Sequence, residues 1–149
     1  MSRTPTALAV VAAALFACTA CASSQKTVDT RRTLSVVRQA GFHDLVVRRP
    51  TGTDSVISVR GFLDQPFSPL TAVRFATVEA AKQRLANDQP LLEGTLSQQD
   101  RSALPDGFDA ARLVDVQVCN VVVSSYNRDN DPALASRVER AVALLRREC

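Results

Sequence analysis

Tryptophan is absent from this chain of 149 residues, and histidine occurs once, as His43. Sugar-binding sites usually stack a flat aromatic ring against the sugar, so the lack of tryptophan disfavours a carbohydrate module. A serine-hydrolase triad or a histidine-containing zinc site would have to use His43 itself. The five glycines are spread singly along the chain, and no glycine-rich phosphate loop is present.

Long runs of one charge are also absent. The formal net charge is +3, and no five or six like charges follow one another. A basic tail for nucleic acid is therefore not indicated, and we expect no nucleic-acid partner. Hydrophobic residues make up 46% of the chain, which is typical of a globular protein. About 120 residues remain after the N-terminal segment, which is enough for one domain with one core.

The N-terminal segment has the parts of a secretory signal peptide. Arg3 gives it a basic start, an apolar run covers residues 7–17, and small residues follow. The run is shorter than the roughly 20 residues that cross a bilayer. It also lacks the polar face of a helix that packs on a domain surface. We therefore predict that residues 1–20 are a signal peptide and that the protein is exported.

At the end of this segment the chain resembles bacterial lipoprotein precursors. Residues 15–18 (Leu-Phe-Ala-Cys) are similar to a lipobox, although Phe16 is bulkier than the usual residue. Residues 18–21 (Cys-Thr-Ala-Cys) are a second such site, with a cysteine in place of the usual leucine. The resemblance covers only the first 21 residues, and it implies a diacylated cysteine, Cys18 or Cys21, that anchors the protein to a membrane. Residues 21–30 would then form a polar tether.

A soluble secreted protein is the alternative. Residues 20–22 (Ala-Cys-Ala) also fit the small-residue pattern of an ordinary cleavage site. Cleavage there would leave an unacylated chain in the periplasm or the medium. The lipobox pattern places Cys18 slightly ahead of Cys21 as the lipid site.

The remaining two cysteines, Cys119 and Cys149, are the natural disulfide pair in an oxidising compartment. A strand from Cys119 would advance about 23 Å in seven residues. A helix of seventeen residues returns about 26 Å and brings Cys149 level with Cys119. Loss of Cys18 with the signal peptide would leave no odd thiol, so the cysteine count favours Cys21 as the lipid site.

The apolar periodicity predicts a single α+β domain over residues 31–149. Helices are expected over residues 30–39, 70–87 and 132–149, and strands over residues 44–49, 55–60 and 112–126. Residues 71–78 are also compatible with a strand. The order implies a two-layer sandwich with about three helices and an antiparallel or mixed sheet of three to four strands.

Few residues of this domain suggest chemistry. Asn120 interrupts an apolar strand and must find hydrogen-bond partners, in a pocket or in a neighbouring strand. Ser124 and Ser125 end that strand without the glycines of a nucleophile elbow. Residues 127, 129 and 131 begin like a calcium loop, but Pro132 stands where glycine is required. We expect no metal and no cofactor.

The sequence therefore favours a non-enzymatic, lipid-anchored envelope domain that binds a protein partner, for example by strand addition at a sheet edge. A small envelope hydrolase that uses Ser124 or Ser125 with His43 is one alternative. A secreted carrier of a small ligand, with an apolar pocket beside Asn120, is another.

Overall fold

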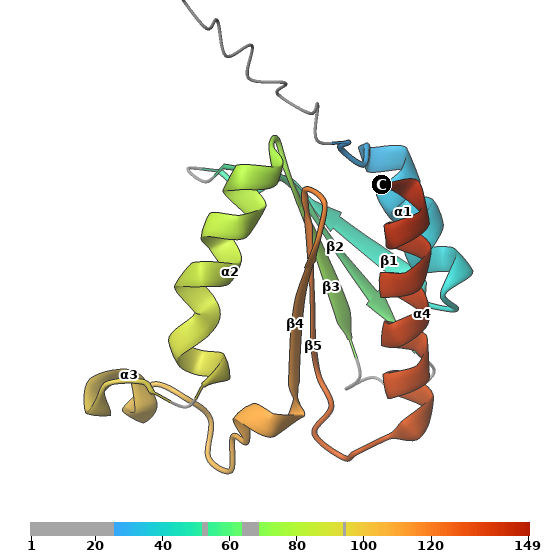
Figure 1. Ribbon diagram of the computed structural model, residues 1–149. Coiled ribbons are helices and arrows are strands. Elements are labelled where there is room, and N and C mark those ends of the chain that lie inside the picture. Colours follow the sequence, from blue (N-terminus) through green and yellow to red (C-terminus); the bar gives the residue numbers. More distant parts are fainter. Residues whose placement is uncertain (1–25, 52–53, 64–68, 94) are drawn as a thin grey trace, which may run out of the picture.

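The computed structural model describes residues 26–51, 54–63, 69–93 and 95–149. These residues form an α+β fold with a five-stranded antiparallel sheet (Figure 1). The helices are α1 (Thr30–Gln39), α2 (Val78–Leu92), α3 (Gln98–Ser102) and α4 (Pro132–Glu148), with a 3-10 turn, η1, at Ala110–Arg112. The strands are β1 (His43–Arg48), β2 (Ser55–Phe62), β3 (Leu70–Phe75), β4 (Leu113–Val118) and β5 (Val121–Tyr126).

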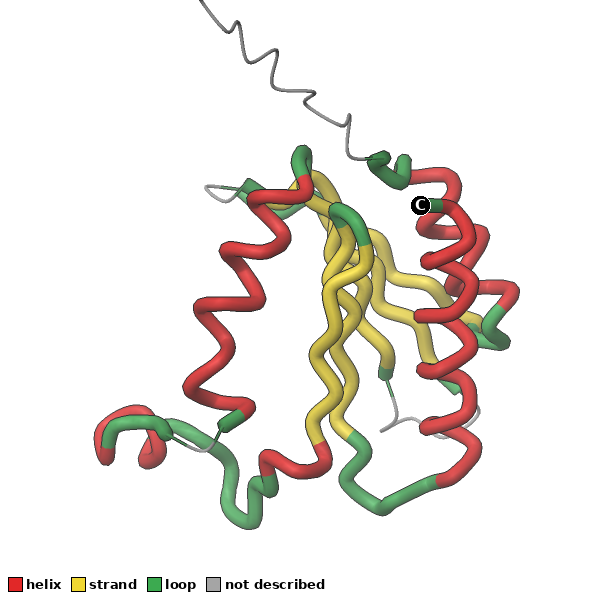
Figure 2. The backbone as a smooth tube through the Cα atoms, viewed as in Figure 1, coloured by secondary structure: helices red, strands yellow, loops and turns green. Residues whose placement is uncertain are grey.

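The strand order is β1-β2-β3-β5-β4, so β1 and β4 are the two edges of the sheet. Helices α1 and α4 cover one face, and α2 covers the other face over β3, β4 and β5 (Figure 2). The predicted α+β class is confirmed. The expected three to four strands were too few, and α2 adds a third layer to the two that were predicted.

The first and last helices begin at the residues that the sequence suggests. The Asp29 side chain accepts a hydrogen bond from Arg32 N and caps α1, and Asp131 caps α4 in the same way with Pro132 in the first turn. Gly41 follows α1 with a φ of 97°, a conformation that suits glycine. Val28 is already buried at 2% exposure, so the packed part of the chain begins before residue 31.

The predicted helix over residues 70–87 is wrong in its first part. Residues 70–75 form β3, as the strand alternative allowed, and the helix begins only at Val78. Leu70 and Ala72 face the core shared with α1 and α4, whereas Phe75 packs with Ala81 of α2 and Val122. This period-two burial fits a strand, and the Thr77 side chain then caps α2 at Ala80 N.

The single strand predicted over residues 112–126 is also wrong, because the chain reverses at Cys119 and Asn120. Strands β4 and β5 pair as a hairpin with Val118 opposite Val121. Cys119 takes a φ of 51°, and neither turn residue is a glycine or a proline that would have marked the turn. The hairpin adds one strand to the three predicted ranges, as β3 adds another, and it leaves β4 at the edge of the sheet.

Candidate functional site

An apolar groove runs between α4 and the edge strand β4. Its volume is about 300 Å³. The helical period of α4 directs a stripe of three apolar residues towards β4, and strand alternation directs two valines of β4 towards α4. These lining residues are Leu134, Val138 and Val142 of α4, and Val114 and Val116 of β4. Glu139 and Arg146 add charged groups to the lining.

Strand β4 offers an unpaired backbone beside this groove. Within the part of the chain that the structure describes, it pairs with β5 on one side only. In an antiparallel pair every second residue directs its N–H and C=O away from the partner strand. The β4–β5 register has no bulge along six consecutive residue pairs. Val114 is 37% exposed although it is apolar. Figure 1 shows β4 at the near edge with no helix in front of it.

The opposite edge strand, β1, is less regular. Its pairing with β2 shifts register between His43 and Val46. Val46 and Val47 are exposed, but the strand ends at Arg48, and Arg49 follows it directly. Bulges and charged residues protect an edge strand from further pairing, so β4 is the better candidate for binding an extended segment.

An acidic pair lies on the other side of β4, where the sheet faces α2. Asp88 of α2 and Asp115 of β4 lie near enough to interact electrostatically. Ser124 Oγ donates to Asp115 Oδ1 at 2.6 Å, and Arg84 Nε lies 3.0 Å from Asp88 Oδ2. Burial is the largest cause that raises the pKa of Asp88 above its ordinary 3.8; Arg84 opposes the rise and Asp115 adds to it.

Asn120, which the sequence left as either a structural residue or a possible binding residue, is fully buried and bonds to backbone. Its Oδ1 accepts a hydrogen bond from Val28 N at 2.6 Å. Its Nδ2 donates to Val28 O at 3.2 Å and to Phe75 O at 2.8 Å. The side chain therefore fastens the segment before α1 to the end of β3, which is the structural role that the sequence allowed.

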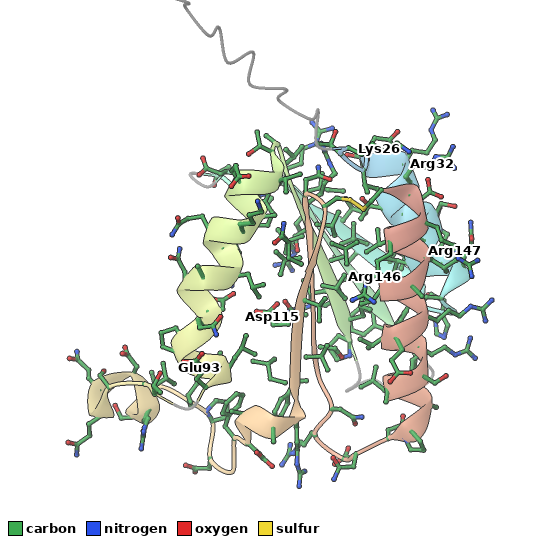
Figure 3. The ribbon with its side chains drawn as sticks, viewed as in Figure 1. Lys26, Arg32, Glu93, Asp115, Arg146 and Arg147 are labelled. Atoms are coloured by element: carbon green, nitrogen blue, oxygen red, sulfur yellow. A yellow bond between two sulfur atoms is a disulfide. The ribbon has the colours of Figure 1, made fainter. Side chains whose placement is uncertain are left out.

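Cys119 and Cys149 form the predicted disulfide, with their Cα atoms 6.2 Å apart. Strand β5 leads away from the hairpin turn and α4 returns to it, as the chain-length argument required. Figure 3 shows this pair as a yellow bond near the C-terminal end of α4. Cys18 and Cys21, with the signal peptide and the first part of the tether, lie outside the described residues.

The hydrolase residues are not brought together. His43 lies in β1 and both serines lie in β5, three strand spacings away. Three spacings of roughly 4.8 Å amount to about 14 Å, far beyond hydrogen-bond reach. His43 Nδ1 instead lies 2.8 Å from Asp44 Oδ2, and Ser125 Oγ donates to Pro69 O.

Sequence reasoning missed the groove and the acidic pair. Both depend on β4 being a separate edge strand, and the sequence pattern merged β4 with β5. Asp88 and Asp115 are 27 positions apart in the chain, and no motif links them. The alternation of Val114, Asp115 and Val116 was the available signal, because it places an acidic residue between two apolar ones.

Comparisons with models of protein families, with curated proteins and with solved structures found no match. Among the residues that the structure describes, no helix has both the length and the apolar composition needed to cross a membrane. In the same part of the chain, no three His, Cys, Asp or Glu side chains gather where they could hold a metal ion.

Proposed function

We propose that this protein is an exported, lipid-anchored envelope protein whose domain binds a protein partner by strand addition at β4. The lipobox-like residues before the domain support the anchor. The observation that carries the binding role is the regular, unpaired edge of β4 beside the groove of about 300 Å³.

In this proposal an extended segment of the partner bonds to the outward N–H and C=O groups of β4. Its side chains alternate between the two faces of the enlarged sheet. Those on the α4 side enter the groove and cover Val114, which removes apolar surface from water. Backbone bonds supply general affinity, and the groove selects apolar side chains.

Photo-cross-linking in the cell tests the binding role. A photo-reactive phenylalanine analogue at Val114 is expected to give an adduct with one partner, which peptide mapping places in an extended segment. The same analogue at Val46, a slightly more exposed valine on the opposite edge strand, is the matched control and should give no adduct. Absence of a Val114 adduct, or equal yields from both edges, contradicts the proposal.

Intact-mass analysis of the protein extracted from membranes tests the anchor separately. A chain that begins at Cys18 or Cys21 and carries a diacylglycerol group is the expected product. An unacylated chain that begins at Ser23 would show that the protein is secreted without a lipid. The same spectrum decides between the two cysteines, which the lipobox and the cysteine count rank differently.

A further inference from the structure

The two faces of β4 would give an added strand very different surroundings. Val114 and Val116 point to the α4 side and line the apolar groove. Asp115 lies between them and points to the α2 side, where it meets Ser124 and Asp88. Figure 3 labels Asp115 on the near strand, on the side that faces α2. The edge therefore has an apolar flank and an acidic flank, separated by the strand itself.

The acidic flank carries more negative than positive groups. Asp88 and Asp115 share it with the guanidinium of Arg84, whose side chain is 54% exposed. A cation placed opposite Asp115 would stabilise the charged form of both carboxyls. Ser124 already holds Asp115 in place through its 2.6 Å hydrogen bond, so the carboxylate is positioned before a partner arrives.

Strand geometry predicts which residue types an added segment should carry opposite these two flanks. Residues directly opposite each other in paired strands have Cβ atoms about 5 Å apart, and neighbours along a strand face opposite sides. A residue opposite Asp115 points to the acidic flank. The residues on either side of it lie opposite Val114 and Val116 and point into the groove.

We propose that β4 binds a protein segment in which a lysine or arginine lies between two apolar residues. This inference rests on the strand addition proposed above and names the chemistry of the segment. The basic side chain pairs with Asp115 and Asp88, and its two neighbours fill the groove formed with α4. A second copy of this chain is a poor occupant at either of its edge strands. Its β4 has an aspartate between the two valines, and in its β1 Val47-Arg48 is followed by Arg49 instead of an apolar residue.

Two synthetic peptides test this pattern against the protein purified from membranes in nonionic detergent. The first is acetyl-Thr-Val-Arg-Val-Thr-amide, and the second has glutamate in place of arginine. Amide chemical shifts are followed by NMR during titration. We expect the arginine peptide to shift the amides of β4 and to bind more tightly than the glutamate peptide.

A matched pair of variants checks the role of the acidic flank. Asp115→Asn keeps the shape of the side chain and should weaken the arginine peptide about five-fold. Glu79→Gln removes an acidic group that α2 pairs with Lys82, away from this flank, and should leave binding unchanged. If Asp115→Asn leaves binding unchanged, the acidic flank does not recognise the segment and the inference is wrong.

Each remaining outcome is also decisive. Equal binding of both peptides at β4 would show that the preference for a basic residue is wrong, while it would still agree with strand addition. Shifts at β1 in place of β4, or no shifts with either peptide, overturn the inference. The Val114 cross-link in the cell is a separate test of strand addition. It shows whether strand addition holds when the proposed peptide pattern is wrong.

Discussion

Asn120 uses both amide N–H donors and its carbonyl oxygen to hold main-chain groups. Two of the three bonds reach Val28, which lies 92 positions earlier in the chain, and the third reaches Phe75. Phe75 N also donates to Asn120 O at 2.8 Å. One residue thus links the entry segment, the end of β3 and the β4–β5 turn.

Replacing Asn120 by alanine should therefore be costly. The change leaves buried backbone groups of Val28 and Phe75 without partners, and we expect a loss of about 3 kcal/mol in the free energy of unfolding. Urea denaturation measures it. Asn87→Ala, which removes an exposed amide that bonds Gln83 within α2, is the control and should change stability by less than about 0.5 kcal/mol. Equal effects of the two substitutions would contradict the fastening role.

Asp88 makes stability depend on pH in an unusual direction for an aspartate. Its pKa is raised in the folded protein, so the folded state holds this proton more tightly than the unfolded chain does. Stability then falls as the pH rises from the ordinary value of 3.8 through the raised pKa, because ionisation in the folded state is disfavoured.

Asp88→Asn should remove this component of the pH dependence. Thermal unfolding measured over the acidic range is expected to show a weaker decline of stability with rising pH in the variant than in the native protein. Asp106→Asn, at an exposed aspartate in the loop before η1, serves as the comparison and should leave the profile unchanged. A profile of Asp88→Asn that matches the native one would rule out the proposed cause.

At the level of elements, the helices with strong end signals were the most predictable. The bounds of α1 agree with the sequence pattern because Asp29 and Gly41 mark its two ends. The start of α4 is marked by Asp131 and Pro132. Local hydrogen-bonding chemistry decides these positions, and it is visible in the sequence.

The β3–α2 junction and the β4–β5 turn were not predictable in the same way. Phe75, Val78 and Ala81 are spaced as on one helix face, yet tertiary pairing with β2 and β5 holds residues 70–75 extended. The turn at Cys119 and Asn120 contains neither glycine nor proline, and the disulfide and the buried amide stabilise it. Contacts between residues far apart in the chain therefore determine the structure at both the β3–α2 junction and the β4–β5 turn.

The disulfide joins the β4–β5 turn to the end of α4. Its loss should lower the free energy of unfolding of the domain. A sequence separation of 30 residues corresponds to about 3.5 kcal/mol in the chain-entropy model. Denaturation of the native protein with and without reductant measures the difference. The double variant Cys119→Ala, Cys149→Ala controls for other effects of the reductant and should not respond to it.

At the scale of the whole molecule, the candidate site depends on which strand lies at the edge. The groove combines β4 with α4, and the acidic flank combines β4 with α2. Sequence patterns indicated the α+β class and most of the apolar residues, but they do not specify strand order. The separate faces of β4 emerge only when the hairpin is formed and placed beyond β3.

If the proposed lipid anchor and strand addition both hold, the Asn120 contacts also set the path of mechanical force. Tension between a lipid before Val28 and a partner held on β4 would pass through the Asn120 amide into the adjoining turn of β4. The disulfide beside it would share the load with α4. Strands β1 and β2 lie off this line, so two of the five strands would carry little of this tension.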